Sequence, residues 1–485
     1  NKISCFLPYA GKEQVEKTVN SLQATGLIEE IRLITTDATL ESLPDCEILF
    51  VDMPYSSATL KAIANAAKGE YTLLYTKETT LEMGMFALER MIHILEDSSA
   101  GMVYADHYQI ADGKQSNAPV IDYQFGSLRD DFNFGSLLLF NTEKLKEAAG
   151  HMKSDYNFAG LYDLRLKLSQ HSDLVHINEY LYSEVENDTR KSGEKIFDYV
   201  DPKNRDRQIE MEQACTEHLK EIGGYLAPEF KKIEFSAGNF EYEASVIIPV
   251  RNRIRTIRDA IKSVLMQKTD FKYNLIIIDN HSTDGTTEAI DEFKDDERVI
   301  HIIPERTDLG IGGCWNMGVH HPKCGKFAVQ LDSDDVYKDE NTLAIMVRAF
   351  YEQNCAMVVG TYMMTDFNMN MIAPGIIDHK EWTPANGRNN ALRINGLGAP
   401  RAFYTPVLRE VKVPNTSYGE DYALGLNFSR QYQIGRVYDV VYLCRRWDDN
   451  SDASLDIVKM NGHNLYKDRI RTWELQARIA MNKNK

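Results

Sequence analysis

Three aspartates at positions 332, 334 and 335 are the residues best suited to chemistry. They follow the apolar run 326–331, which predicts a buried strand whose alternating side chains place Asp332 and Asp334 on one face. Two adjacent carboxylates repel each other unless a cation lies between them. Mg2+ and Mn2+ take oxygen ligands and often share them with a diphosphate. The pattern predicts a metal–diphosphate site; an acidic loop that caps the next helix is the alternative.

Further polar residues follow a second predicted strand, 275–278. Asp279 and Asn280 come directly after it, and ligands of α/β sheets bind at the carboxyl ends of strands. A carboxylate and an amide there can pair with a nucleobase or a ribose hydroxyl. The glycines between 310 and 318 surround Asn316 and would let the backbone approach a phosphate or a ribose.

Glu420 and Asp421 follow Gly419 at the start of a predicted helix. A carboxylate at this place can act as a general base for an attacking hydroxyl. The alternative is helix capping, or a charge favoured by the positive end of the helix dipole.

These residues need a scaffold, and strands alternate with amphipathic helices in both halves of the chain, which predicts α/β domains with mostly parallel central sheets. The order of elements recurs. Gly69 before the strand 71–75 matches Gly325 before the strand 327–331, and the late helix around 162–169 matches 422–429. We therefore predict a tandem duplication of about 240 residues per copy.

The predicted boundaries are a first domain over 1–184, a helical linker over 185–240 and a second domain over 241–485. The second domain is expected to include a C-terminal helix over 465–481. Packing of this helix on its own domain is favoured over contact with a membrane surface.

Composition restricts the class of protein. A chain of 485 residues is too long for one core, and a net charge of −17 argues against non-specific nucleic-acid binding. No stretch approaches the roughly 20 apolar residues of a membrane span. Seven cysteines without a Cys-x-x-Cys pair indicate reduced thiols, as in a cytoplasm.

The second half resembles family 2 glycosyltransferases of the GT-A fold, from residue 241 to about residue 450. The similarity is carried by five short motifs, at 245–252, 279–285, 312–318, 332–335 and 419–421. The resemblance implies a nucleotide-sugar donor, a Mn2+ or Mg2+ ion and inversion at the anomeric carbon. It also implies a nucleotide-diphospho-sugar transferase architecture, which is Rossmann-like.

The resemblance further implies a role for each matched residue. Asp421 is the expected base, with Glu420 beside it, and Asp334, Asp332 and Asp335 are the expected metal ligands. The residues expected to bind the donor nucleotide are Pro249, Arg251, Asn252, Asp279, Asn280, Asn316, Asp332 and Arg446. Trp447 stands where many relatives have a metal-binding histidine, and Arg445 or Arg446 could hold the diphosphate instead.

The first half lacks this chemistry. Thr76-Lys77-Glu78-Thr79 falls opposite 332–335, and Gly160-Leu161 falls opposite Glu420-Asp421. Tyr104-Ala105-Asp106-His107 is expected to be a loop with a solvated histidine. We interpret the first half as a degenerate GT-A-like domain without transferase activity.

The predicted function is metal-dependent, inverting transfer from a UDP-, dTDP- or GDP-sugar to a hydroxyl of a glycan or lipid-linked acceptor, in surface polysaccharide synthesis. A cytoplasmic location is expected, with peripheral contact at the inner face of the membrane as an option. The alternatives are a sugar nucleotidyltransferase and a non-catalytic glycan-binding scaffold.

Overall fold

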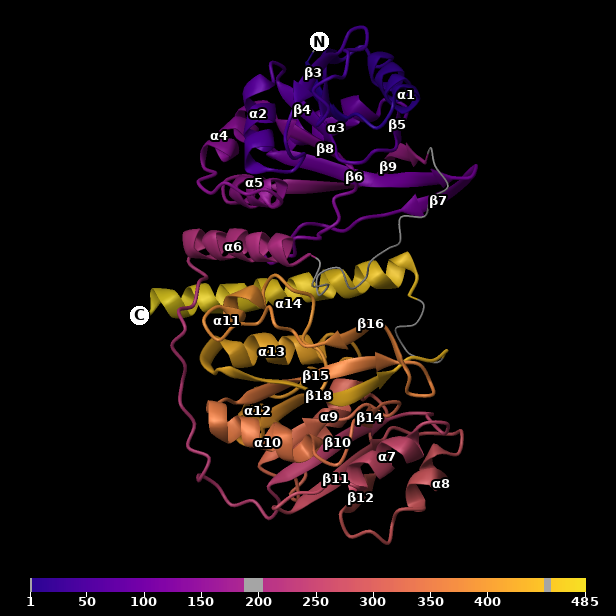
Figure 1. The fold of residues 1–485 in the computed structure, drawn as a ribbon, viewed down its shortest axis with the longest axis vertical. Helices are drawn as coiled ribbons and strands as arrows, with labels where there is room; N and C mark the ends of the chain where they lie inside the picture. Colours follow the sequence, from indigo (N-terminus) through magenta and orange to yellow (C-terminus); the bar gives the residue numbers. More distant parts are fainter. Residues whose placement is uncertain (1, 187–203, 449–454) are drawn as a thin grey trace. The chain divides into compact units, whose positions relative to one another are not determined.

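The computed structural model describes residues 2–186, 204–448 and 455–485 (Figure 1). These residues form two compact units. The first contains 2–186, 204–224 and 456–472, and the second contains 225–448, 455 and 473–485. The remaining part of the predicted linker, 187–203, lies outside the described residues, as do residues 1 and 449–454.

The first unit is built on a nine-stranded mixed sheet in the order β3-β2-β1-β4-β8-β6-β9-β5, with β7 paired to β6. Its strands are β1 (Ile3–Pro8), β2 (Ile28–Thr35), β3 (Glu47–Phe50), β4 (Tyr71–Tyr75), β5 (Thr80–Met83), β6 (Met102–Ala111), β7 (Lys114–Ala118), β8 (Leu137–Asn141) and β9 (Leu174–Val185). Its helices are α1 (Lys12–Gln23), α2 (Ser57–Ala66), α3 (Ala87–Asp97), α4 (Thr142–Gly150), α5 (Gly160–Ser169) and α6 (Arg205–Ile222). Two apolar clusters form the core, one on each face of the sheet.

The second unit repeats this plan in the order β12-β11-β10-β13-β17-β15-β18-β14, with β16 paired to β15. Its strands are β10 (Ala244–Val250), β11 (Tyr273–Asp279), β12 (Val299–Ile302), β13 (Phe327–Gln330), β14 (Val336–Tyr337), β15 (Met357–Thr365), β16 (Met371–Ile377), β17 (Arg401–Tyr404) and β18 (Ile434–Arg445). Its helices are α7 (Ile257–Leu265), α8 (Thr286–Asp291), α9 (Ile311–Val319), α10 (Thr342–Gln353), α11 (Gly387–Asn390), α12 (Thr405–Val411) and α13 (Glu420–Gln431).

The two sheets match strand for strand, which confirms the predicted pair of similar α/β domains. Each is parallel over its first four neighbouring strands, and in each the next strand, β8 or β17, runs antiparallel. One interaction is repeated in detail: Ser4 Oγ accepts a hydrogen bond from Gly69 N at 2.8 Å, and Ser245 Oγ accepts one from Gly325 N at 2.7 Å. A β-carbon on either glycine would meet the neighbouring strand's backbone within 3 Å, so the matched glycines have a steric reason.

Helix α14 (Ile457–Lys483) confirms the predicted C-terminal helix, but its place differs from the prediction. Residues 456–472 group with the first unit and only 473–485 with the second. In the first unit, Asp468 Oδ2 accepts a hydrogen bond from Ser127 Oγ at 2.9 Å. The sequence predicts that the whole helix belongs to the second domain, because it does not reveal which residues the charged side chains of the helix contact.

The segment Tyr104–His107 also differs from its prediction as a loop. It lies inside β6, and His107 is buried. Asp106 Oδ1 accepts hydrogen bonds from Val120 N and from His176 Nε2, both at 2.8 Å. The sequence does not predict this strand, because the polar side chains of β6 are hydrogen-bonded to residues that are distant in the sequence.

Candidate active site

The carboxyl ends of β10, β11 and β13 bring the predicted site residues together. These strands are parallel neighbours, with Val250 opposite Asp279 and Ile247 opposite Gln330. All three strands are mainly apolar and buried, and polar residues are concentrated where the chain leaves the sheet. Residues that follow the three strands therefore share one edge, where ligands of such sheets bind.

The three aspartates after β13 have different environments. Asp332 Oδ1 accepts a hydrogen bond from Gln330 Nε2 at 3.0 Å, and Asp334 Oδ2 accepts one from Trp447 Nε1 at 3.2 Å. Asp335 is buried, and its two oxygens accept from Tyr442 OH at 2.7 Å and from Arg445 N at 2.8 Å. Asp335 thus ties the acidic turn to β18, and its role as a metal ligand stays a prediction.

The carboxylates of the acidic turn repel one another. Burial, followed by the charges of Asp334 and Asp332, raises the pKa of Asp335 well above its usual value. Desolvation of the carboxylate and the repulsion from Asp334 raise the pKa of Asp332, although the residue as a whole is exposed. A divalent cation at Asp332 and Asp334 would relieve this repulsion, so the residues present fit such an ion.

Within the described parts of the chain, no three His, Cys, Asp or Glu side chains are grouped so that they could hold a metal by themselves. Two carboxylates are a small ligand set for Mg2+, which is usually bound through one or two carboxylates together with substrate phosphates. The geometry therefore suits a metal that arrives with, or is completed by, a diphosphate.

Helix α13 presents the second acidic group, and its two carboxylates differ. Asp421 Oδ2 lies 3.1 Å from Arg401 Nη1. Glu420 Oε2 is buried, and none of the described residues offers it a hydrogen bond. Burial, then the Asp421 charge, raises the pKa of Glu420 to about 8. Asp421 is thus a charge-paired carboxylate, whereas Glu420 is mainly protonated at neutral pH.

Arg401 is a site residue that the sequence motifs did not identify. It opens β17, and its backbone N–H donates to Gln330 Oε1 at 3.0 Å, while Gln330 Nε2 holds Asp332. Although the guanidinium is desolvated, the charges of Asp421 and then of Asp332 raise its pKa. Arg401 therefore links the acidic turn to α13. Only the antiparallel pairing of β17 with β13 brings it there, and no local signal marks it.

Asp279, predicted to contact the nucleoside, is fully buried instead. Its Oδ2 accepts from Thr287 Oγ1 at 2.6 Å and lies 3.0 Å from His301 Nε2. These partners, with Ser282, lower the pKa of Asp279 to about 2 in spite of its desolvation. The carboxylate thus anchors the turn after β11, and its contact with the nucleoside stays a prediction.

The neighbouring residues of this turn are more accessible. Asn280 Nδ2 donates to Leu309 O at 2.9 Å. Asn252, in the left-handed region at φ 53°, accepts at Oδ1 from Thr283 N at 2.7 Å. Pro249 is half-buried and Arg251 is exposed at the same edge. The structure thus brings these four predicted nucleotide-binding residues to the end of β10 and β11.

Asn316 and the glycines around it have structural partners. The Asn316 amide donates to Val413 O at 2.7 Å and accepts from Val413 N at 2.8 Å. A β-carbon on Gly312 would lie 1.7 Å from Pro414 O. Gly312 and Gly313 therefore let α9 pack against the segment 413–416, and Gly318 lets it pack against Ile247 of β10, which are structural reasons other than the predicted approach of a phosphate.

Trp447 is surrounded by cations as well as by Asp334. The guanidinium carbons of Arg255 and Arg253 lie 5.1 and 6.0 Å from its ring centre. Arg446, predicted to hold the diphosphate, donates its backbone N–H to Thr365 O at 2.8 Å and directs Nε at Met364 Sδ, 3.1 Å away. The guanidinium of Arg445, the other candidate, donates through Nε to the backbone carbonyl of Asp334 at 3.1 Å. Arg445, together with Arg253 and Arg255 beside Trp447, therefore brings positive charge close to the acidic turn.

Comparison with known proteins agrees with this geometry. The family model described as glycosyl transferase family 2 matches residues 245–402. An uncharacterized glycosyltransferase of Rickettsia felis is 37% identical over 198 residues, which cover 40% of this chain and 31% of that protein. The GalNAc(5)-diNAcBac-PP-undecaprenol beta-1,3-glucosyltransferase of Campylobacter jejuni is 36% identical over 93 residues, covering 19% and 29%. This chain thus spans less than a third of either relative.

Among solved structures, Staphylococcus aureus TarS 1–349 in complex with UDP-GlcNAc is similar at a TM-score of 0.37 and 19% identity, over 49% of this chain and 72% of that one. The fold is that of an α/β protein with two mixed, mostly parallel sheets of matching strand order. Residues 245–402 form a family 2 glycosyltransferase domain within the second unit.

Proposed function

We propose that the second unit transfers a sugar, with inversion, from a nucleoside-diphosphate donor to a hydroxyl of a glycan or lipid-linked acceptor. The observation that carries the proposal is the pair of acidic groups, Asp332 with Asp334 and Glu420 with Asp421, joined through Arg401. One group suits the charge of a leaving diphosphate, and the other suits the proton of an incoming hydroxyl.

In this mechanism Asp421 accepts the proton of the acceptor hydroxyl as the oxygen bonds to the anomeric carbon. The bond from that carbon to the diphosphate oxygen breaks on the opposite face, and the electron pair leaves with the nucleoside diphosphate. Asp334 and Asp332 would hold Mn2+ or Mg2+, which supplies charge neutralisation for the leaving group. Arg401 pairs with Asp421 and holds it in position, while Trp447 orients Asp334.

The donor nucleotide is proposed to lie over the ends of β10 and β11, against Asn252, Asn280 and Arg251. Asp279 takes part only by holding the turn in place. The activity in the name of the Campylobacter jejuni relative supports a lipid-linked acceptor, and a surface polysaccharide is the proposed product class. None of the described helices is long and apolar enough to cross a membrane; we propose a cytoplasmic site of action.

The first unit is proposed to be non-catalytic. Lys77, opposite Ser333 in the duplication, lies 2.9 Å from the buried Glu184, whose pKa His107 and Lys77 lower to about 2 in spite of desolvation. A lysine ammonium thus stands near the place where the second unit has its acidic turn. Because the Lys77 ammonium already supplies positive charge at this place, a divalent metal would gain little by binding there.

The test is incubation of the full chain with UDP-, dTDP- and GDP-sugars and Mn2+, with release of nucleoside diphosphate as the readout. We expect one base to be strongly preferred and the release to stop in Asp334→Asn. Formation of a nucleotide-sugar and pyrophosphate from a sugar phosphate and a nucleoside triphosphate would show a nucleotidyltransferase instead. Absence of both reactions, with every donor and an extract of lipid-linked glycans, would favour a scaffold.

A further inference from the structure

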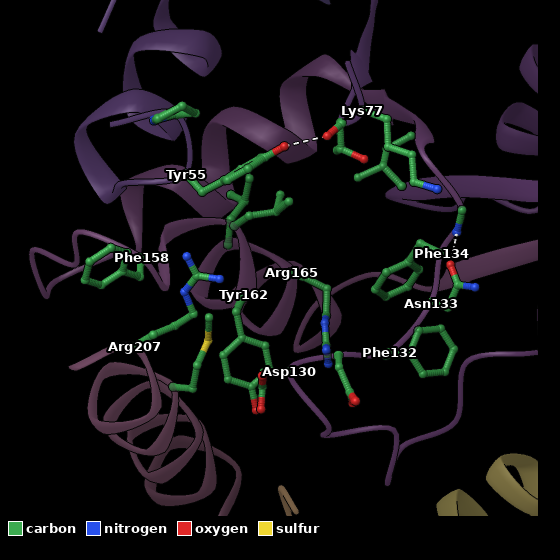
Figure 2. A pocket seen from close by; sticks show the side chains of 18 of the residues that line it. Tyr55, Lys77, Asp130, Phe132, Asn133, Phe134, Phe158, Tyr162, Arg165 and Arg207 are labelled. Atoms are coloured by element: carbon green, nitrogen blue, oxygen red, sulfur yellow. Dashed lines mark hydrogen bonds between the residues drawn. The ribbon is translucent and has the colours of Figure 1, made fainter. Parts of the chain in front are cut away.

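The first unit contains a cavity of about 630 Å3 (Figure 2). It lies at the carboxyl end of β4, and its walls come from the segment after β3, the segment before β8 and the first turns of α5 and α6. Every residue that lines it belongs to the first unit. The proposed transfer reaction uses none of them.

The cavity occupies the place that the active site occupies in the second unit. Thr76 and Lys77 line it directly after β4, as Asp332 and Ser333 follow β13. Leu161 lines it in the first turn of α5, at the position that Asp421 has in α13. The first unit thus has a cavity at the position where the second unit has its carboxylates.

The lining combines aromatic rings with both hydrogen-bond donors and acceptors. Tyr55 is 39% exposed, Phe134 and Phe158 are half-buried, and the rings stand around the space in Figure 2. The amides of Asn133 and Asn157 are exposed at the rim. Aromatic faces suit the apolar faces of a ligand, whereas amides can both donate and accept at its edge.

The cavity lining carries charges of both signs: the cations Lys77, Arg165 and Arg207 and the carboxylates Asp130 and Asp131. Lys77 is paired with Glu184 at 2.9 Å, Arg165 Nη1 donates to the backbone carbonyl of Ser127 at 2.8 Å, and Arg207 lies over the Phe158 ring. A phosphate or diphosphate is usually bound by cations that converge on it, whereas these cations alternate with carboxylates, a carbonyl and a ring. A neutral ligand with apolar faces and hydroxyl edges fits this lining better.

The walls are fixed by backbone contacts. Gly160 N donates to Tyr55 O at 2.9 Å, and a β-carbon on Gly160 would lie 2.4 Å from the backbone carbon of Ser56, so α5 is held against the segment that carries Tyr55. Glu210 of α6 accepts from Phe158 N at 3.1 Å, and Arg207 lies over the Phe158 ring at 5.4 Å. A preformed pocket loses less entropy on binding.

We propose that this cavity binds a neutral sugar ring of an oligosaccharide without transforming it. A pyranose has two apolar C–H faces and a rim of hydroxyl groups, which is the chemistry that the rings and amides match. Tyr55 and Phe158 provide the stacking faces, and Asn133 and Asn157 contact the hydroxyls. The inference goes beyond the proposed function, because it does not depend on transfer in the second unit.

The test uses the full chain and saturation-transfer NMR with maltotriose, cellotriose, chitotriose, mannotriose and β-1,3-linked glucotriose as probes. We expect at least one trisaccharide to bind, and its affinity to fall about tenfold or more in Tyr55→Ala and in Phe158→Ala. Asn157→Ala provides a milder change at an exposed position if an aromatic variant unfolds. The matched control is Asp421→Asn, in which binding should be unchanged.

Several results would overturn the proposal. They are binding of none of the five probes, binding that the three cavity variants leave unchanged, and binding that is lost in Asp421→Asn. Binding of UDP, GDP or inorganic phosphate that the cavity variants abolish would show an anion site instead. Because the proposed transfer is read out separately as nucleotide release, failure of one proposal leaves the other measurable.

Discussion

Arg401 Nη1 lies 3.1 Å from Asp421 Oδ2, and this contact joins the two acidic groups of the second unit. Arg401 begins β17, whereas Asp421 is in the first turn of α13. The guanidinium also lies in the field of Asp332. A single cation thus balances the carboxylate proposed as base and a carboxylate on the donor side, so its removal should affect both.

Replacement of Arg401 by Met is predicted to lower transfer about 10²-fold at pH 6.5, because an unpaired Asp421 is more easily protonated. The loss should be smaller at pH 8.5, and Arg401→Lys should restore part of the rate at both. The measurement is a pH–rate profile of the three proteins. A loss that is the same at every pH would indicate that Arg401 is only structural.

The two carboxylates of α13 are predicted to behave differently. Asp421→Asn should lower transfer by about 10²–10⁴-fold, the usual effect of removing a positioned base, and keep nucleotide binding. Glu420→Gln should retain most activity, because Glu420 is mainly protonated at neutral pH and glutamine resembles that form. Steady-state rates and nucleotide calorimetry on both variants check this. Equal losses, or loss of nucleotide binding in Asp421→Asn, would contradict the assignment.

Glu420 also predicts a dependence of stability on pH. Its folded-state pKa of about 8 is above the usual 4.5, so the folded protein holds a proton there that the unfolded chain has released. The contribution of Glu420 to the free energy of unfolding is fully present below its unfolded-state pKa of 4.5. It is lost as the pH rises through the folded-state pKa of about 8, at a slope on the order of 1 kcal/mol per pH unit. Denaturant unfolding between pH 5 and 8 should therefore show a shallower decline in Glu420→Gln than in the original chain. If the free energy of unfolding declined equally with pH in both proteins, Glu420 would not be the cause of the decline.

Trp447 is predicted to tune metal affinity through its contact with Asp334. Trp447→His places an imidazole beside that carboxylate, where many relatives have a histidine, and should lower the Mn2+ concentration needed for half-maximal activity. Trp447→Phe keeps a ring for Arg255 but removes the N–H donor, so the Mn2+ requirement should stay the same or rise. Mn2+ titrations of the three proteins decide this. If Trp447→His needed a higher Mn2+ concentration for half-maximal activity, the metal would not bind beside residue 447.

The fold was predictable because its signals are local. Apolar runs such as 275–278 and the matched Gly69 and Gly325 predicted two similar α/β domains, and the strand orders agree. The partners of those glycines, Ser4 and Ser245, were not predicted, since a hydrogen bond across two strands leaves no mark in the sequence.

The site was predictable in position but not in the use of each side chain. Asp335, Asp279 and Asn316 look like ligands by type, yet their polar atoms are committed to Tyr442, His301 and Val413. Arg401 was missed for the opposite reason: it lies in no motif, and only the pairing of β17 with β13 gives it a role.

The central claim is that the second unit alone performs metal-dependent transfer. The most direct measurement is release of nucleoside diphosphate by three proteins, the original chain, Asp334→Asn and Glu78→Gln, with Mn2+ and with EDTA. The account predicts release by the original chain and by Glu78→Gln at equal rates with Mn2+, none with EDTA, and none by Asp334→Asn. Full release by Asp334→Asn, or a loss confined to Glu78→Gln, would contradict it.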